Sequence, residues 1–242
     1  MKPEIVIDAA PHKGQGRVHN SAARFKVLRA GRRWGKTRLG VMECLDTASK
    51  GGRAWWVAPT YKTGDVGWRP LRTLASKIPG AEIRRSERMI VLPSGGTVTV
   101  RSADNPDSLR GDSLDFVVMD ECAFMQEDAW TEALRPALAD RKGRALFIST
   151  PKGRNWFFTL WNQAAQQPQW EAFHFTSYDN PYIEDAEIDA AKATLPEATF
   201  MQEFLAEFVD DASLVFRGVQ QSATAKQAEG RRGDTVYVAG LD

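Results

Sequence analysis

The stretch RAGRRWGKTRLG, Arg29 to Gly40, constrains the fold of this 242-residue chain more than any other. It matches the phosphate-binding pattern of Gly, four residues, then Gly-Lys-Ser/Thr, except that Ala30 stands at the first position. FKVLRA before it alternates like a strand over 25–30, and TRLGVMECLDTAS after it carries a broad apolar face that predicts a helix over 37–49. Strand, loop and helix in this order are what the pattern requires.

Residues 30–37, which we call the phosphate loop, supply three chemical functions in this pattern. Gly35 lets backbone N–H groups approach phosphate oxygens, Lys36 reaches the β- and γ-phosphates, and the Thr37 hydroxyl binds Mg²⁺. The other nucleotide-binding candidates in the loop are Gly31, Arg32, Arg33 and Trp34. The alternative is an ordinary strand-to-helix turn that carries basic side chains on the surface.

Two acids end the apolar run LDFVVMDE over 114–121. In enzymes with a phosphate loop, an acid at the tip of a buried strand holds Mg²⁺, and Asp120 fits this role. An adjacent carboxylate can polarise the attacking water as a general base, and Glu121 fits that role. A strand that ends in two solvated acids is the alternative, and the phosphate loop earlier in the chain makes it the weaker interpretation.

Hydroxyl and guanidinium groups extend the candidate site. Ser149 and Thr150 follow the apolar run RALFIST, where hydroxyls can sense the γ-phosphate and couple hydrolysis to motion. Phosphoryl transfer often uses an arginine to stabilise the charge of the transition state. Arg32, Arg33 and Arg110 are the candidates for that role.

Apolar strands alternate with helical patterns through most of the chain, which predicts a mostly parallel sheet with helices on both faces. A hairpin is expected over 88–103, with its turn at Ser94 to Gly96. The further expected strands are 53–60, 114–121, 144–150 and a strand at the start of 170–181, and the further expected helices are 66–80, 126–143, 155–167, 183–195 and 197–208.

Charge is segregated although the net charge is only +1. Residues 1–110 hold 21 Lys and Arg against 9 Asp and Glu, and residues 111–242 hold 11 against 22. A polyanion near the first half is one interpretation, and mutual neutralisation within one domain is the other.

Cys44 and Cys122 lack the spacing of a disulfide framework or zinc site. Without a signal peptide or an apolar run of about 18 residues, we expect an intracellular protein with no membrane span.

The chain resembles the large terminase subunits of tailed bacteriophages, the motors that package DNA into the procapsid. Alanine at the first position of the phosphate loop is usual in that family. The resemblance covers nearly the whole chain and rests on six motifs in order: AGRRWGKT (30–37), APTY (58–61), NPDSLRGDSLDFVVMDECAF (105–124), STPKGRNWF (149–157), TSYDNPYI (176–183) and FMQEFLAEF (200–208).

The resemblance implies four parts in the chain. A P-loop ATPase core of the ASCE type spans 1–175, a small helical lid subdomain spans 176–216, and a linker spans 217–234. Residues 235–242 resemble the first strand of an RNase H-like nuclease domain, with Asp242 as its first metal-binding aspartate. One carboxylate cannot hold a two-metal site, so we expect no nuclease activity.

The resemblance also implies ATP and Mg²⁺ as cofactors. Lys36 and Thr37 would bind them, Asp120 would hold the metal, Glu121 would activate water, and Ser149-Thr150 would be the coupling motif. Arg110 resembles an arginine finger that enters a neighbouring subunit, with Arg32 and Arg33 as rivals. Gln15 is a weaker match to an adenine-sensing glutamine.

The implied function is a packaging motor that translocates double-stranded DNA in the host cell cytoplasm. Its implied partners are the portal protein, the small terminase subunit and further copies of itself in a ring of five, with a monomer expected for the isolated fragment. A helicase-like DNA-dependent ATPase is one alternative, because APTY and STP have helicase analogues, but the chain is short for a second domain of that kind. A non-enzymatic nucleotide-binding scaffold is the other, and the pair Asp120 and Glu121 argues against it.

Overall fold

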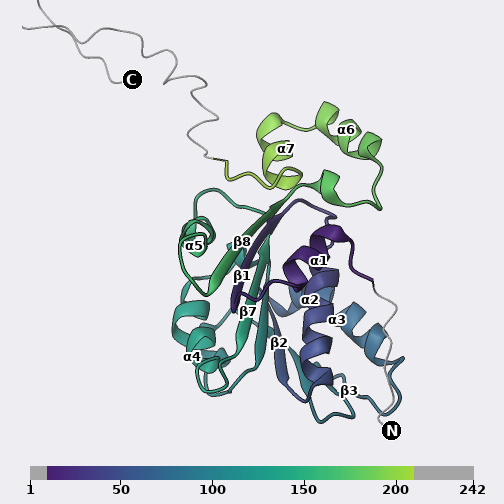
Figure 1. The fold of residues 1–242 in the computed structure, drawn as a ribbon, viewed down its shortest axis with the longest axis vertical. Helices are drawn as coiled ribbons and strands as arrows, with labels where there is room; N and C mark the ends of the chain where they lie inside the picture. Colours follow the sequence, from purple (N-terminus) through teal and green to yellow (C-terminus); the bar gives the residue numbers. More distant parts are fainter. Residues whose placement is uncertain (1–9, 210–242) are drawn as a thin grey trace, which may run out of the picture. The chain divides into compact units, whose positions relative to one another are not determined.

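An eight-stranded sheet organises residues 10–209, the part of the chain that the computed structural model describes (Figure 1). The strand order is β3-β4-β5-β2-β6-β7-β1-β8. The strands are β1 (Phe25–Ala30), β2 (Arg53–Ala58), β3 (Glu82–Arg84), β4 (Met89–Val91), β5 (Thr97–Ser102), β6 (Phe116–Asp120), β7 (Arg144–Ser149) and β8 (Trp170–Phe175).

Six of these strands run parallel, from β5 to β8 across the sheet, and β3, β4 and β5 pair antiparallel. In the central register Leu28 of β1 lies between Ile148 of β7 and Phe173 of β8. The six parallel strands therefore end at one edge of the sheet, which is where ligands bind in open α/β folds. The predicted hairpin forms from β4 and β5.

Helices cover both faces of the sheet (Figure 1). One face carries α1 (Lys13–His19), α2 (Lys36–Ser49) and α3 (Tyr61–Ala75), and the other carries a π-helix (Ala129–Leu134), α4 (Arg135–Ala137) and α5 (Trp156–Ala164). Adjacent strand residues point to opposite faces: Trp56 is buried in the core under α2 and α3, and Trp55 in the core on the other side. The mostly parallel sheet flanked by helices agrees with the sequence prediction.

The helix expected over 66–80 spans Tyr61–Ala75, and the helix expected over 197–208 ends at Glu203. Three other elements differ more strongly from the sequence expectations. α1 and β3 were not expected; both are short, at seven and three residues, and carry little periodic signal. The helix expected over 126–143 is a π-helix followed by a single α-helical turn. Pro136 lies in the first turn of α4, where its missing N–H group is tolerated, and the π-helix ends directly before that turn.

After β8 the chain forms two further helices beyond the sheet, α6 (Asp185–Thr194) and α7 (Glu197–Glu203) (Figure 1). All described residues belong to one compact unit. The division at residue 175 between core and lid stays a prediction, and the predicted linker and final strand lie outside the described residues. Within residues 10–209, no helix is both long and apolar enough to cross a membrane.

Candidate functional site

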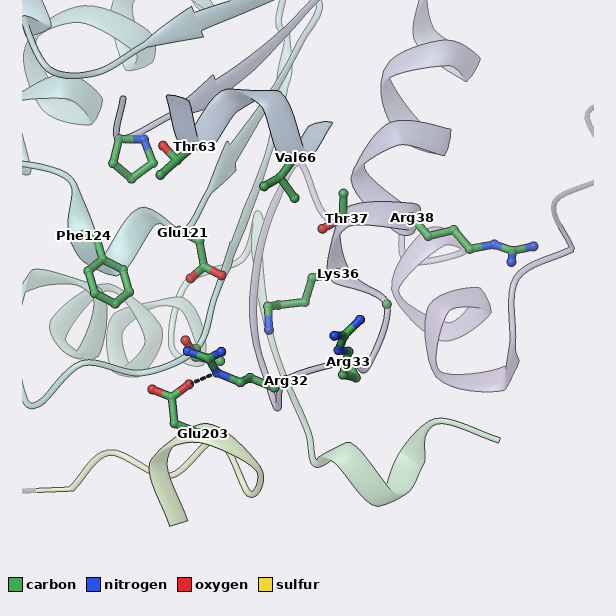
Figure 2. A pocket seen from close by; sticks show the side chains of 13 residues that line it. Arg32, Arg33, Lys36, Thr37, Arg38, Thr63, Val66, Glu121, Phe124 and Glu203 are labelled. Atoms are coloured by element: carbon green, nitrogen blue, oxygen red, sulfur yellow. Dashed lines mark hydrogen bonds and ion pairs between the residues drawn. The ribbon is translucent and has the colours of Figure 1, made fainter. Parts of the chain in front are cut away.

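A pocket of about 950 Å³ opens at the edge where the parallel strands end (Figure 2). Its volume lies in the range of small-molecule sites. Its walls come from the phosphate loop, the start of α2, the segment after β2, the first half of α3, the segment after β6, the residue after β7 and α7. The lining residues are Arg32, Arg33, Gly35, Lys36, Thr37, Arg38, Pro59, Thr63, Val66, Glu121, Phe124, Thr150 and Glu203.

The phosphate loop turns sharply between β1 and α2. Gly35 has a φ of 104° and Arg33 a φ of 63°, both in the left-handed region. Glycine adopts this conformation freely, whereas a side chain at Arg33 costs about 1 kcal/mol or more. A strained residue persists only where its surroundings fix it, so residues outside the loop must hold its backbone conformation.

Lys36 points into the pocket from the first turn of α2 (Figure 2). Its ammonium group donates to Ala30 O at 2.7 Å and to Gly31 O at 3.1 Å, within its own loop. Burial lowers the pKa of Lys36, and the negative charges of Glu121 and Asp120 oppose that shift. The lysine thus lies between the loop and the acids, where an anion would compete with the two carbonyl oxygens for its protons.

Asp120 and Glu121 end β6 on the other side of the pocket. Asp120 is 4% exposed, and burial, followed by the adjacent Glu121 carboxylate, raises the pKa of Asp120 to about 7. Glu121 has a φ of 51°, which turns its side chain into the pocket beside Lys36 (Figure 2). A buried carboxyl group with a raised pKa next to a second acid is an arrangement that a cation would stabilise.

β7 lies between β1 and β6 in the sheet, so its end lies between the phosphate loop and the two acids. The Ser149 hydroxyl, fully buried, donates to Glu121 Oε2 at 3.2 Å and accepts from the Ala123 N–H at 3.3 Å. Thr150 lines the pocket itself. The structure therefore brings together Lys36, Thr37, Glu121 and Thr150 around one space, with Ser149 and Asp120 directly behind it.

Two predicted residues are buried beside the loop rather than exposed to the pocket. The Trp34 ring is fully buried and stacks on Phe175, with ring centroids 4.8 Å apart. Gln15 is 1% exposed; its Nε2 donates to Gly35 O at 2.9 Å, and its Oε1 accepts from the His12 N–H at 3.1 Å. Both side chains support the loop, and a role of Gln15 in adenine recognition stays a prediction.

The segment after β8 contacts the phosphate loop directly, which the sequence interpretation did not assign. Glu203 accepts from the Arg32 N–H through its carbonyl at 2.7 Å and from Arg32 Nε through its carboxylate at 2.5 Å. That carboxylate raises the pKa of Arg32. A Cβ at Gly31 would lie 2.3 Å from Phe204 O, so only glycine permits this close approach. The motif FMQEFLAEF contains Glu203 and Phe204 and was the available signal.

Arg110 lies apart from the pocket. Its guanidinium contacts Glu132 at 2.6 Å and Asp107 at 3.0 Å, and its side chain is half exposed. Arg32 and Arg33 do line the pocket. The choice of arginine finger among these three residues stays a prediction, and Asp242 lies outside the described residues.

Comparisons of sequence give a consistent result. The family model described as "Terminase large subunit, T4likevirus-type, N-terminal" matches residues 27–222. A terminase large subunit from Thermus virus P23-45 is 32% identical over 96% of this chain and 57% of its own length, and one from Escherichia phage T5 is 35% identical over 76% and 44%. The chain spans about half the length of these curated relatives.

Comparisons of structure agree. The large terminase ATPase domain of Thermus phage P74-26 is similar with a TM-score of 0.73 and 30% identity, over 83% of this chain and 94% of that one. A large terminase from a thermophilic bacteriophage, solved in complex with ADP, has the same fold, with a TM-score of 0.68 and 18% identity over 82% and 53%. The predicted fold class, an α/β P-loop NTPase, is confirmed.

Proposed function

Because the chain belongs to the family of terminase large subunits, we propose that it is the ATP-hydrolysing motor domain of a viral DNA-packaging machine. It drives double-stranded DNA into a procapsid. The observation that carries the proposal is the convergence of Lys36, Thr37 and Glu121 on one pocket, with Asp120 buried behind them. These residue types are those that bind a triphosphate and activate water.

In the binding step, Lys36 leaves the carbonyl oxygens of Ala30 and Gly31 and pairs with the β- and γ-phosphates. The turn at Gly35 directs backbone N–H groups toward the same phosphates. The hydroxyl of Thr37 and the carboxylate of Asp120 are hard oxygen ligands of the kind Mg²⁺ prefers, and they would hold it; the bound ion supplies positive charge to the triphosphate.

In the hydrolysis step, Glu121 accepts a proton from the water that attacks the γ-phosphate. Its left-handed backbone aims the carboxylate into the pocket, and the hydrogen bond from Ser149 fixes one carboxylate oxygen. The other oxygen is the one that remains for water. Ser149 thus orients the base, while Thr150 faces the pocket and is placed to respond to the γ-phosphate.

In this proposal, arginines stabilise the negative charge of the transition state. Arg110 acts on the pocket of a neighbouring copy in a ring of five subunits, because in its own chain it lies with Glu132 and Asp107 instead. Arg32 and Arg33 act within the pocket that they line. The further partners are double-stranded DNA, the portal protein and the small terminase subunit, in the host cell cytoplasm. The excess of basic residues in 1–110 supports contact with a DNA backbone.

The nucleotide site is tested by titrating the chain with ATP and ADP in the presence of Mg²⁺. Lys36→Ala should weaken binding by about 10- to 100-fold, because it removes charged hydrogen bonds to phosphate. Lys77→Ala, an exposed lysine after α3, is the matched control and should bind as the wild type does. Equal binding by wild type and Lys36→Ala would contradict the assignment of the pocket.

A helicase-like DNA-dependent ATPase is the alternative proposal, since any motor that tracks along DNA needs the same pocket. The two are separated by a strand-displacement assay on a duplex with a single-stranded tail. A packaging motor shows ATP turnover stimulated by duplex DNA without strand separation, and ATP-dependent release of the displaced strand would favour the helicase.

A further inference from the structure

Four consecutive carbonyl oxygens of the phosphate loop are each held by a side chain from outside the loop. Ser177 Oγ donates to Arg32 O at 2.7 Å, and Asn180 Nδ2 donates to Arg33 O at 2.6 Å. His12 Nε2 donates to Trp34 O at 2.9 Å, and Gln15 Nε2 donates to Gly35 O at 2.9 Å. The first two side chains follow β8, and the other two belong to the start of α1.

Because each peptide group is planar, these contacts also fix the direction of the N–H group that follows each carbonyl. In a trans peptide the C=O and the N–H of the next residue point in opposite directions. Holding the oxygens of Arg32, Trp34 and Gly35 therefore directs the N–H groups of Arg33, Gly35 and Lys36 away from the holding side chains. Among residues 10–209, no group accepts from these three N–H groups.

The holding side chains are themselves fixed. Ser177 is 1% exposed and Asn180 8%, and Asn180 Oδ1 also accepts from the Tyr182 N–H at 3.0 Å. His12 Nδ1 accepts from the Gly14 N–H at 3.2 Å, which leaves the ring hydrogen on Nε2 for Trp34 O. Groups that are locked by their own partners can set the geometry of a loop.

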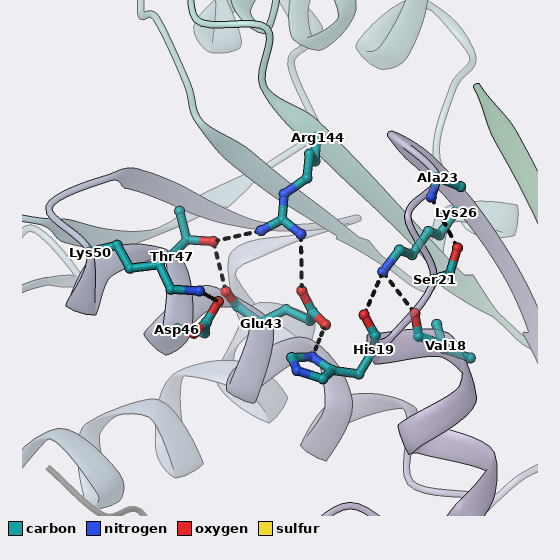
Figure 3. Close-up of polar contacts among 10 residues, drawn as sticks. All are labelled: Val18, His19, Ser21, Ala23, Lys26, Glu43, Asp46, Thr47, Lys50 and Arg144. Atoms are coloured by element: carbon teal, nitrogen blue, oxygen red, sulfur yellow. Dashed lines mark hydrogen bonds and ion pairs between the residues drawn. The ribbon is translucent and has the colours of Figure 1, made fainter.

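α1 is also fixed at its far end (Figure 3). His19 Nδ1 lies 2.6 Å from Glu43 Oε1 of α2, and Lys26 Nζ of β1 donates to Val18 O at 2.7 Å and His19 O at 3.1 Å. Glu43 is buried and also faces Arg144 at 3.7 Å. α1 is thus tied to α2 and β1, so the two donors at its start are held in place relative to the loop.

We infer that Ser177, Asn180, His12 and Gln15 are positioning residues that preset the phosphate-binding N–H groups of the loop. They touch no phosphate; they act through the backbone of Arg32 to Gly35. Asn180 acts differently from the other three: it holds the carbonyl oxygen of the strained Arg33, and the N–H that follows it, that of Trp34, donates to Gly31 O at 3.3 Å, so Asn180 fixes the left-handed turn that shapes the loop. The inference rests on the proposed function, since it assumes that the loop receives phosphate.

The test measures the dissociation constant for ADP with Mg²⁺ by calorimetry, at a temperature where thermal denaturation shows every variant to be folded. Asn180→Ala should weaken ADP binding by about tenfold and Ser177→Ala by about threefold to tenfold, as expected for loss of one hydrogen bond each. With ATP, KM should rise more than kcat falls. Ser177→Ala removes one oxygen atom and leaves the bond from the Ser177 N–H to Phe204 O, so it provides a result even where Asn180→Ala does not fold.

Two controls make the same chemical change away from the pocket. Asn162 Nδ2 donates to Phe158 O at 3.0 Å within α5, and Ser76 Oγ donates to Thr73 O at 2.9 Å after α3. Asn162→Ala and Ser76→Ala should leave the ADP dissociation constant unchanged. If Asn180→Ala and Ser177→Ala bind ADP as tightly as these controls do, the inference is overturned while the proposed function stands. If the wild type binds no nucleotide, the proposed function fails first.

Discussion

The Ser149 hydroxyl donates to Glu121 Oε2 across 3.2 Å, so the end of one strand orients the acid that follows its neighbour. The same hydroxyl accepts from the Ala123 N–H, and Asn155 Nδ2 donates to Ala123 O at 2.6 Å. The turn that carries Glu121 is therefore held by both β7 and the start of α5. This relationship links strand order to the direction in which the base points.

Ser149→Ala should reduce kcat by about tenfold and leave the ATP dissociation constant close to that of the wild type. The change frees the Glu121 carboxylate to rotate but does not touch the phosphate loop. Steady-state kinetics and equilibrium binding check this together, with Ser113→Ala, whose hydroxyl contacts Asp140 on the surface, as the control. A Ser149→Ala variant with unchanged kcat would remove Ser149 as the residue that orients the base.

The pKa of Asp120, raised from 3.8 to about 7, predicts a pH dependence of stability. The folded domain holds this proton more tightly than the unfolded chain, so between pH 3.8 and about 7 the folded state binds more protons. The contribution of Asp120 to the free energy of unfolding is therefore present below the unfolded pKa and is lost as the pH rises through about 7.

Denaturant unfolding of the domain without nucleotide or Mg²⁺, from about pH 5 to about pH 8, measures this loss. Asp120→Asn should flatten the decline in unfolding free energy over this range, because the amide does not titrate. Asp128→Asn, at an exposed aspartate before the π-helix, should leave the decline as it is. A decline that is equally steep in Asp120→Asn would show that another group causes it.

Gly31→Ala should destabilise the domain by about 1–3 kcal/mol. The added Cβ would lie 2.3 Å from Phe204 O and 2.5 Å from Ser177 Oγ, so the segment after β8 must move away from the phosphate loop. Gly16→Ala is the control: a Cβ there meets nothing within 4 Å, and alanine in a helix interior is favoured over glycine by up to about 1 kcal/mol. Denaturant unfolding of the two variants should show changes of opposite sign; equal stability of Gly31→Ala and the wild type would contradict the close contact.

Arg110→Ala tests the action of one subunit on the next. Arg110→Ala and Lys36→Ala should each be inactive in an assembled ring, and mixing them should restore part of the ATPase activity. In mixed interfaces, Arg110 of the Lys36→Ala copy reaches an intact pocket in the Arg110→Ala copy. Arg141→Ala, at a partly exposed arginine near Asp115, should remain active alone. No recovery at any mixing ratio would exclude the role in trans.

The sequence was sufficient for seven of the eight strands in residues 10–209 and for the main chemical groups, because both follow local rules. β1 is bounded as expected, at Phe25–Ala30, since alternation ends where the glycine-containing loop begins. Asp120 and Glu121 stand at the end of an apolar run, and the parallel pairing of β6 with β7 and of β7 with β1 brings them near Lys36.

The side chains that hold the loop could not be derived in this way. Asn180 is 147 residues from Arg33 in sequence, and nothing in its neighbourhood indicates a contact with a backbone carbonyl. The contact of Gln15 with Gly35 O presents the same difficulty, because hydrogen bonds from a side chain to the backbone leave no periodic pattern. Trp34 was expected at the nucleotide, and only the structure shows its ring stacked on Phe175 in the core.

Glu121 is tested as the general base by comparing steady-state ATP hydrolysis of the wild type and Glu121→Gln, over a range of protein concentrations, with and without duplex DNA. Glu127→Gln, at an exposed glutamate near the same strand end, is the control. We expect wild-type turnover that rises more steeply than linearly with concentration, and a loss of at least about 100-fold in Glu121→Gln with ATP binding retained. Turnover by Glu121→Gln at the wild-type rate would contradict that role.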